Sequence, residues 1–362
     1  MVAVVNSEGS ASPRLTVAGA GAIGREAWTL RAMITDGTAN MTLGGVVGGG
    51  FGVDAVKLFM GSGPTMGWPS VLASGVGLAS VVFGLWLRRR SRRRMRVGVV
   101  VSAMDARRGL MRARQLEQQA EAFSRGACMV TLKAGVELSD GGGWNQALVG
   151  ALADETLSAM TLAERLTPDA GQINLIPTMP LNVAFWFGSR LGYTHAREVV
   201  VHALRQANGT PAYFPATSLR AMDADVEPLT VERLRAIDGG DPRAVALALD
   251  LQGHGDQFFD QVTAACRQHN IGYLLSIQSP ADLPENRITS VGVVEQTFRA
   301  WRDAPFPVGA RAGRHAIFLN GPVAIAVALG ARLASPGHGT WTAFTFDEAS
   351  NLFEPFPPVL PD

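Results

Sequence analysis

The sequence GPVAIAVALGARL at residues 321–333 has a counterpart, PLNVAFWFGSRL, at residues 180–191. Both contain the pattern P-x-x-x-A-x-x-x-G-x-R-L, and the two copies are 142 positions apart, with prolines at 180 and 322. An internal repeat at a fixed offset indicates a repeated structural unit. Each copy follows a short apolar run, residues 173–176 and 317–319, of the kind that forms a strand. The repeat therefore predicts a duplicated strand–helix unit.

Each copy is expected to form a helix that begins at its proline, because the first helical turn needs no N–H donor there. Alanine and glycine then stand four positions apart on one helix face, as Ala184 with Gly188 and as Ala326 with Gly330. Such small residues let the helix backbone approach a sheet or a second helix closely. One copy alone would indicate only a tightly packed helix, whereas two copies at one offset indicate a duplicated domain.

Strands alternate with helices on both sides of a charged stretch at residues 218–243, which predicts a linker with a short helix. In the first half we expect strands at residues 97–101, 127–132, 173–176 and 198–203, an aromatic-proline ending at 213–215, and helices at 106–125, 145–166 and 180–191. In the second half we expect strands at residues 245–251, 273–277, 317–319 and 341–346, a similar ending at 353–355, and helices at 256–268, 291–301 and 322–333. This alternation predicts an α/β fold of two tandem Rossmann-like halves with mostly parallel sheets.

The expected domain boundaries follow from the same pattern. They are residues 1–38 for an N-terminal tail, 39–87 for an apolar region, 88–96 for a basic linker, 97–217 for the first half, 218–243 for the linker between the halves, and 244–358 for the second half.

Composition excludes several classes of protein. The 362 residues are 47% apolar and 17% charged, which is typical of a globular chain, and the net charge of +1 does not by itself indicate a class of partner. Two cysteines, Cys128 and Cys266, are too few for a disulfide framework and lack metal-ligand spacing. The sequence contains no H-E-x-x-H, P-loop or nucleophile-elbow motif. We therefore expect no metal, no cofactor and no catalytic residue.

The N-terminal quarter contains a candidate transmembrane helix at residues 69–87, which are uncharged. A helix of that length measures roughly 28 Å, close to the thickness of the hydrocarbon core of a bilayer. Seven arginines follow within residues 88–96. Because basic residues flank spans on the cytoplasmic side, everything after residue 96 is expected in the cytoplasm.

A second span is expected as an alternative at residues 39–59, where the apolar sequence is interrupted by Asp54 and Lys57. The turn sequence at residues 61–64 would join the two spans as a hairpin. The sequence leaves one span and two spans open.

Residues 19–24, GAGAIG, match G-x-G-x-x-G but predict no dinucleotide site. That fingerprint requires a βαβ unit and an acidic residue about twenty positions later. Here Asp36 comes too early, and the chain continues into Gly-rich apolar sequence. We interpret the match as chance.

The duplicated pattern resembles the SAVED domain, a fusion of two CARF-like (CRISPR-associated Rossmann) halves. The most similar stretches are LALDLQGHGDQ at residues 247–257 and AIFLNGPVAIAVALGARL at residues 316–333, and the resemblance covers residues 96–355. That family senses cyclic oligonucleotides in the bacterial anti-phage systems called CBASS. Its SAVED domain is usually fused to an effector, and the N-terminal apolar region implies the membrane-fused type here.

The expected ligand is therefore a cyclic oligonucleotide, a cyclic tri- or tetranucleotide. Ligands of open α/β sheets bind beyond the carboxyl ends of the strands, and helix N-termini attract anions. Arg107 and Lys133 would face phosphates, while Met104 and Met179 could pack on bases. Gln278, at the end of its strand, is expected to be the counterpart of Lys133. The candidate ligand-binding residues are Ser102, Met104, Arg107, Lys133, Thr178, Met179, Pro180, Gln252, His254, Gln278, Asn320, Gly321 and Pro322.

The resemblance and the apolar region together imply a receptor in the inner membrane with its SAVED domain in the cytoplasm. Ligand would drive self-association, and the clustered helices would disrupt the membrane. The expected partners are the cyclic oligonucleotide, the lipid bilayer, further copies of the chain and, functionally, a nucleotidyltransferase that makes the signal; direct binding of DNA or RNA is not expected.

Two alternatives remain from the sequence. One is a membrane-tethered α/β enzyme, such as a ring nuclease that cleaves its own ligand with help from His254 or Lys133. The other is a two-lobed protein that binds a small molecule.

Overall fold

The computed structural model describes residues 14–18, 82–83, 97–105, 110–138, 145–168, 170–207, 210–280, 283–334, 339–347 and 352–357. The predicted spans at 39–59 and 69–87 lie outside these residues except for positions 82–83, and Arg107 and the basic run at 88–96 lie outside them entirely. None of the helices in the described part combines the length and the apolar character needed to cross a bilayer.

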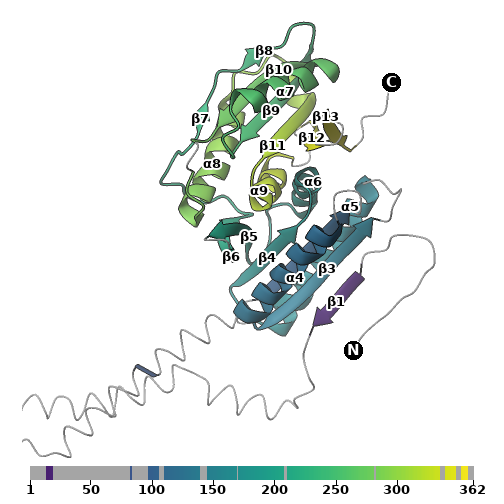
Figure 1. Ribbon diagram of the computed structural model, residues 1–362, viewed down its shortest axis with the longest axis vertical. Helices are drawn as coiled ribbons and strands as arrows, with labels where there is room; N and C mark the ends of the chain where they lie inside the picture. The colour runs from purple at the N-terminus through teal and green to yellow at the C-terminus, as the bar shows by residue number, and fades with distance from the viewer. Residues whose placement is uncertain are drawn as a thin grey trace, which may run out of the picture. The chain divides into compact units, whose positions relative to one another are not determined.

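The first half is built on a six-stranded sheet (Figure 1). Its strands are β1 (Arg14–Ala18), β2 (Val97–Asp105), β3 (Val130–Leu138), β4 (Gln172–Thr178), β5 (Glu198–Ala207) and β6 (Thr210–Ser218). The spatial order is β1-β3-β2-β4-β5-β6, with β2 to β5 parallel and the two edge strands antiparallel. Its helices are α4 (Leu110–Ala127), α5 (Gln146–Leu166) and α6 (Leu181–Leu191).

The second half repeats this plan. Its main strands are β9 (Asp241–Asp250), β10 (Ile271–Gln278), β11 (Arg314–Asn320), β12 (Thr340–Asp347) and β13 (Leu352–Phe356). They follow the order β13-β12-β11-β9-β10, which is the order of the first half with β9 in the place of β2. The helices are α7 (Asp256–Gln268), α8 (Arg287–Asp303) and α9 (Val323–Leu333). The prediction of two α/β halves with mostly parallel sheets is confirmed.

Strand register identifies equivalent positions in the two halves. Ser102 on β2 pairs with Thr178 on β4, and Asp250 on β9 pairs with Asn320 on β11. Thr178 and Asn320 are separated by the 142-residue offset of the sequence repeat. The duplication seen in the sequence is therefore a duplication of the fold.

The repeated helices α6 and α9 pack against each other between the two sheets (Figure 1). A Cβ atom at Gly188 would lie 2.0 Å from the carbonyl oxygen of Val327, and one at Gly330 would lie 1.9 Å from the carbonyl oxygen of Phe185. The small residues of the repeat thus let the two helix backbones approach each other, as the sequence predicts.

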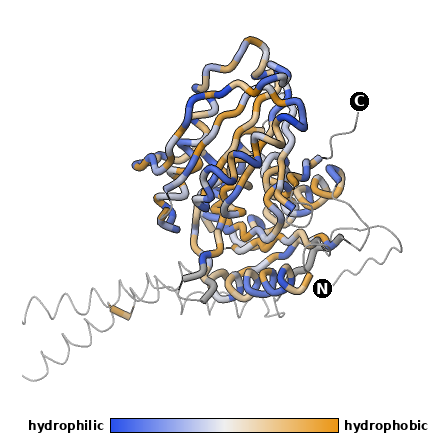
Figure 2. The backbone as a smooth tube through the Cα atoms, turned by 45° about the horizontal axis from the view of Figure 1, so that its top comes forward, coloured by the Kyte–Doolittle hydropathy of each residue, from blue (hydrophilic) through white to orange (hydrophobic). Residues whose placement is uncertain are grey.

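One hydrophobic core runs through both halves. The ring of Phe185 on α6 lies 5.4 Å from the ring of Trp341 on β12. Trp186 Nε1 donates a hydrogen bond of 2.8 Å to the carbonyl oxygen of Phe356 on β13. Figure 2 shows the apolar residues concentrated along the strands. The halves are therefore joined by buried apolar contacts as well as by the linker.

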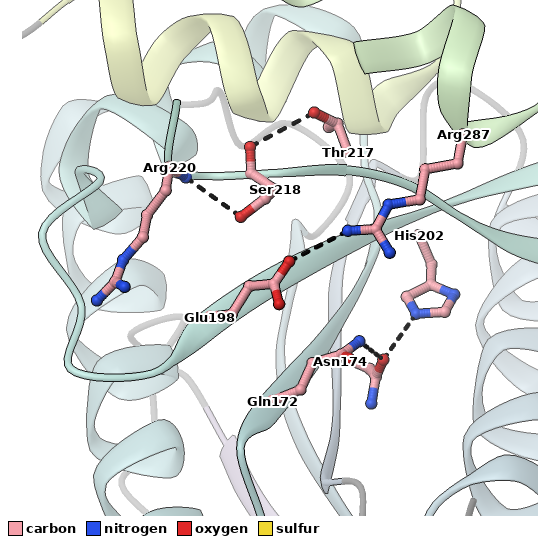
Figure 3. A network of polar contacts seen from close by, with 8 residues as sticks. All are labelled: Gln172, Asn174, Glu198, His202, Thr217, Ser218, Arg220 and Arg287. Atoms are coloured by element: carbon pink, nitrogen blue, oxygen red, sulfur yellow. Dashed lines mark hydrogen bonds and ion pairs between the residues drawn. The ribbon is translucent and has the colours of Figure 1, made fainter. Parts of the chain in front are cut away.

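Polar contacts also join the halves at the amino end of β5 (Figure 3). Glu198, the first residue of β5, pairs with Arg287, the first residue of α8, at 3.2 Å. Beneath this pair, His202 Nε2 lies 2.9 Å from Asn174 Oδ1, which also accepts a 2.9 Å hydrogen bond from Gln172 Nε2. This network lies at the amino ends of β4 and β5, away from the carboxyl ends.

Several predicted boundaries were wrong. The strand predicted at 127–132 begins at Val130 and continues to Leu138. Lys133 therefore lies within β3 rather than at its end, and the charge of its ammonium group is compensated by Glu117 of α4. The helix predicted at 106–125 ends at Ala127, two residues later than predicted, and its predicted first residues, 106–109, lie outside the described part of the chain.

The predicted linker and tail also contribute strands. Residues 219–242 contain no helix; they form β7 (Thr230–Val231) and β8 (Arg235–Ala236), which pair with β10. Without β7 and β8, backbone N–H and C=O groups along the outer edge of β10 would have no partner in the sheet. Within the tail, β1 pairs antiparallel with β3. An antiparallel edge strand is not the central strand of a βαβ unit; the GAGAIG sequence at 19–24 itself lies outside the described residues.

Candidate ligand-binding site

The candidate site is the pair of carboxyl edges, which we define as the ends of β2 and β4 in the first half and of β9 and β11 in the second. In each half these two strands are neighbours. After one of them the chain continues to a strand on one flank of the pair, and after the other it continues to a strand on the opposite flank. Such a switch point is where ligands of open α/β sheets bind. The helices α6 and α9 begin there, each with a proline as its N-cap.

The second carboxyl edge is organised by Asp250, whose side chain is completely buried. Its Oδ2 accepts a 2.7 Å hydrogen bond from the backbone N–H of Gly255, and its Oδ1 accepts one of 3.1 Å from Gln252. Asn320 Nδ2 donates to the same Oδ1 at 3.4 Å. A buried carboxylate requires such donors, and here they fold the loop after β9 over its end.

The loop of residues 251–255 presents His254 to solvent. Gly253 and Gly255 have positive φ values of 72° and 57°, which a residue with a Cβ rarely adopts, so the tight turn depends on them. The side chain of His254 is 51% exposed. Its Nδ1 lies 2.6 Å from Asn320 Nδ2 and 3.8 Å from Asp250 Oδ1.

The structure brings together the other predicted residues of the second half. Gln278 ends β10 directly beside Asp250, and its Nε2 lies 3.4 Å from the position of a Cβ at Gly255. Gly321 packs against Leu251, because a Cβ at position 321 would lie 2.9 Å from two side-chain atoms of that leucine. Gln252 is exposed, and Pro322 is half-buried at the start of α9.

The first carboxyl edge is organised by Glu117, which the sequence analysis missed. Ser102 is completely buried, and its hydroxyl donates a 2.5 Å hydrogen bond to Glu117 Oε1. Lys133 Nζ lies 3.1 Å from the same oxygen. The signal available in the sequence was an acid on the apolar face of α4, between Leu116 and Ala120.

The remaining predicted residues of the first half are less exposed. Thr178 donates a 3.3 Å hydrogen bond to the carbonyl oxygen of Val101. Met104 and Met179 are buried, at 9% and 8% exposure, and Pro180 is half-buried. Side-chain groups of the first edge therefore point mostly into the fold.

The prediction that Gln278 is the counterpart of Lys133 is wrong. Gln278 pairs with Asp250 across β10 and β9, and the matching partner of Ser102 across β3 and β2 is Gly135. The counterpart of Gln278 is therefore Gly135, because β3 continues beyond Lys133. Among the described residues, no group of three His, Cys, Asp or Glu side chains could hold a metal ion.

The comparisons with known proteins give matches only among solved structures. No protein-family model matches the chain, and neither does any curated protein. The chain is similar to the Acinetobacter baumannii Cap4 SAVED/CARF-domain containing receptor with the cyclic trinucleotide 2'3'3'-cAAA, at 12% identity and a TM-score of 0.44, over 79% of this chain and 57% of the receptor.

Two further structures give the same result. The same receptor with 3'3'3'-cAAA has 12% identity and a TM-score of 0.43, over 79% of this chain and 66% of that one. The Moraxella osloensis Cap4 receptor has 11% identity and a TM-score of 0.36, over 79% and 64%. The chain thus spans 57% to 66% of the length of these three structures. All three of these solved structures are of SAVED/CARF-domain containing receptors.

Proposed function

We propose that this chain is a membrane-anchored receptor for a cyclic oligonucleotide in anti-phage defence. The observation that carries the proposal is the fusion of two halves with equivalent carboxyl edges. A cyclic oligonucleotide repeats a phosphate and a base around a ring, so it can engage two related edges at once. The N-termini of α6 and α9, one at each edge, favour anionic groups. One of the two receptors named in the comparisons, that of Acinetobacter baumannii, was solved with cyclic trinucleotides, which supports a ligand of this class.

The membrane anchor is proposed from the apolar sequence at 69–87 and the arginines that follow it. The pairing of β1 with β3 supports two spans rather than one. Strand β1 precedes the apolar region in the sequence and β2 follows it, yet both belong to the same sheet. A chain that leaves a sheet and returns to it on the same side of a membrane crosses an even number of times. Residues 39–59 would then supply the other span.

The distance between β1 and β2 also fits a hairpin of two transmembrane helices. Ala18 at the end of β1 pairs with Thr131, and Val97 at the start of β2 pairs with Val130, so the chain leaves and re-enters on either side of β3 at one end of the sheet. Strands two positions apart in a sheet are about 10 Å apart. Two packed helices lie about 8–10 Å apart. The two proposed helices would therefore match the distance between β1 and β2.

The proposed output is self-association. Ligand bound at the carboxyl edges would favour contacts between copies of the chain in the inner membrane, with the SAVED-like domain in the cytoplasm. Clustered hairpins would then disrupt the bilayer. The signal would come from a nucleotidyltransferase that makes the cyclic oligonucleotide, which is a functional partner rather than a bound one.

We propose binding without turnover, with no cofactor or metal. The experiment is incubation of the purified full chain in detergent with a panel of cyclic di-, tri- and tetranucleotides, followed by thermal unfolding and recovery of the ligand. Ligand at 100 times its Kd should stabilise the folded chain by about 2.7 kcal/mol. Recovery of intact ligand supports a receptor, and cleaved ligand would identify a ring nuclease instead. A folded chain that no member of the panel stabilises would rule out the proposed ligand class.

The anchor and the output need separate measurements. Reporter proteins fused before Met1 and after Asp362 should both be active in the cytoplasm, and a reporter inserted at residues 61–64 should be active outside it. Opposite locations for the two ends would contradict the hairpin. In lipid vesicles, the matching ligand should raise the mass of the receptor complex and release an entrapped dye. Ligand binding without either change would contradict the proposed output.

A further inference from the structure

The two carboxyl edges differ at their equivalent positions. In the first half, the register-matched positions are occupied by Ser102, Thr178 and Gly135. Both hydroxyls donate within the fold, to Glu117 and to the carbonyl oxygen of Val101, and the glycine has no side chain. In the second half, the matching positions are Asp250, Asn320 and Gln278, and the latter two are half-buried amides. The edges therefore offer different groups to a ligand.

The buried carboxylate of Asp250 fixes the orientation of the Asn320 amide. Both carboxylate oxygens already accept hydrogen bonds from backbone N–H groups, so Asp250 can only accept. The atom of Asn320 that faces Asp250 Oδ1 at 3.4 Å must be a donor, which is Nδ2. The reversed amide would place two oxygens against each other. The acceptor Oδ1 of Asn320 is thereby left for another partner.

The same amide group fixes the tautomer of His254. Asn320 Nδ2 lies 2.6 Å from His254 Nδ1, and two donors cannot approach that closely. His254 Nδ1 therefore accepts, and the proton of the neutral ring is on Nε2. His254 Nε2 is then a donor on a side chain that is half exposed.

Asn320 and His254 thus form an acceptor and a donor on adjacent side chains, which we call the amide–imidazole pair. The side-chain hydrogen bonds of Asn320 and His254 within the described residues use Asn320 Nδ2 and His254 Nδ1, and they leave Asn320 Oδ1 and His254 Nε2 for a ligand. An acceptor beside a donor complements a base edge with an amino group beside a ring nitrogen. Adenine has that edge, with N6 as donor and N7 as acceptor, whereas guanine has two acceptors at N7 and O6.

We propose that the amide–imidazole pair of the second half selects the base of the ligand, requiring an amino group such as that of adenine. The inference rests on the proposed function and deepens it. The first half contributes no comparable group among its described residues, so base selection is asymmetric although the fold is duplicated. Asp250 is a positioning residue: it contacts no ligand but determines which atoms of Asn320 and His254 face one.

The test uses two cyclic trinucleotides that differ at one functional group. One carries three adenines, and the other carries three unsubstituted purines, in which hydrogen replaces the amino group and no other donor takes its place. Binding to the full chain in detergent is measured by calorimetry at constant salt, because phosphate contacts make the affinity salt-dependent. The all-adenine ring should bind roughly 5- to 150-fold more tightly, the range that one matched pair of base contacts supports.

Three variants locate the selection. In Asn320→Ala and in His254→Ala, the preference for adenine should fall to within about twofold. The exposed His254 allows that substitution even if Asn320→Ala fails to fold. Gln268→Ala, an exposed amide at the far end of α7, is the matched control and should retain both the affinity and the preference.

Each outcome decides between the two claims. Equal binding of the two rings by the wild-type chain would overturn the selection by an amino group but leave the receptor proposal standing. A preference that persists in both variants would show that other residues read the base, and would also overturn the inference. If the folded chain binds neither ring nor any other cyclic oligonucleotide, the proposed function fails and the inference fails with it.

Discussion

Gly188 of α6 lies directly against Val327 of α9, where a Cβ atom would be 2.0 Å from the carbonyl oxygen of the valine. Adding the 142-residue offset to Gly188 gives Gly330, and subtracting it from Val327 gives Phe185. Gly330 lies against Phe185 in the same way, at 1.9 Å. The two contacts are thus equivalent, and the duplicated helices meet through a reciprocal pair of glycines.

Replacing either glycine with alanine should destabilise the folded chain. Real Cβ atoms essentially never approach a backbone oxygen that closely, so Gly188→Ala or Gly330→Ala must push the helices apart. Overpacking of a core costs typically about 1–3 kcal/mol. Thermal unfolding of the full chain measures the loss. Gly150→Ala on α5 is the matched control, because no atom lies within 4 Å of the added methyl group. It should stabilise the chain by about 0.5–1 kcal/mol, and equal effects at the three positions would contradict the prediction.

The repeated arginines should differ in their contribution to stability. Arg332 pairs with Glu295 of α8, and the two side chains are only 7% and 12% exposed. Its guanidinium carbon also lies 4.2 Å from the centre of the Phe298 ring. Arg332→Ala leaves the Glu295 carboxylate buried without its cation, which should cost about 3–5 kcal/mol.

Arg190 is the control for this substitution, since it occupies the same position in the other copy of the repeat but is exposed. Arg190→Ala should change the free energy of unfolding by less than about 0.5 kcal/mol. Similar losses for Arg190→Ala and Arg332→Ala would show that the buried pair is not what stabilises this position.

Lys133 should stabilise the chain through Glu117. Its ammonium group compensates a carboxylate that is 11% exposed, and the lysine itself is 28% exposed. Lys133→Met should therefore cost about 1–3 kcal/mol, the penalty for leaving a partly buried charge unpaired. The second change Glu117→Gln should recover part of this loss, because an amide oxygen can still accept from Ser102. Arg114→Ala breaks an exposed pair with Glu137 between the same two elements and should cost less than about 1 kcal/mol. If it cost as much as Lys133→Met, burial would not explain the difference.

Glu155 on α5 should make stability depend on pH. Burial raises the pKa of this carboxyl from 4.5 to about 7, and its Oε2 is a buried atom without a hydrogen-bond partner among the described residues. The folded chain therefore holds a proton that the unfolded chain loses above pH 4.5. This contribution to stability is complete below pH 4.5 and is lost as the pH rises through about 7.

Glu155→Gln should accordingly stabilise the chain at pH 8 and change little at pH 4, as measured by denaturant unfolding at the two values. Asp154→Asn, an exposed neighbour on the same helix, is the control for a change of charge alone. A stabilisation by Glu155→Gln that is the same at both pH values would contradict a role for its ionisation.

Much of the fold could be predicted because it depends on local pattern. Helix α7 begins and ends at the predicted residues, Asp256 and Gln268. Helix α5 begins one residue after Asn145, whose side chain accepts a 2.8 Å hydrogen bond from Leu148 N as an N-cap. Apolar periodicity and helix caps each involve only a few neighbouring positions, and the repeat is visible as a fixed spacing along the chain, so the duplicated α/β fold could be predicted.

The errors came from contacts between distant positions. The end predicted for β3 at Lys133 was wrong: the strand continues to Leu138, and Glu117 of another element compensates the charge of Lys133 within the sheet. The strands β1, β7 and β8 were missed because short segments pair only when a sheet edge is available to them. The candidate residues of the second edge did come together, since parallel strands end at one side of a sheet.

The amino-acid sequence was sufficient to predict the duplication, the α/β class and the carboxyl edges that hold the candidate ligand-binding residues, because each follows from spacing along the chain. Only the tertiary structure decided that α6 and α9 form the contact between the halves and that Gln278 corresponds to Gly135. It alone decided the difference between the two edges, with Ser102 turned toward Glu117 and Asp250 orienting Asn320 and His254. The physical reason is that donors and acceptors find their partners in space, and those partners lie 15, 70 and 66 positions apart in the chain.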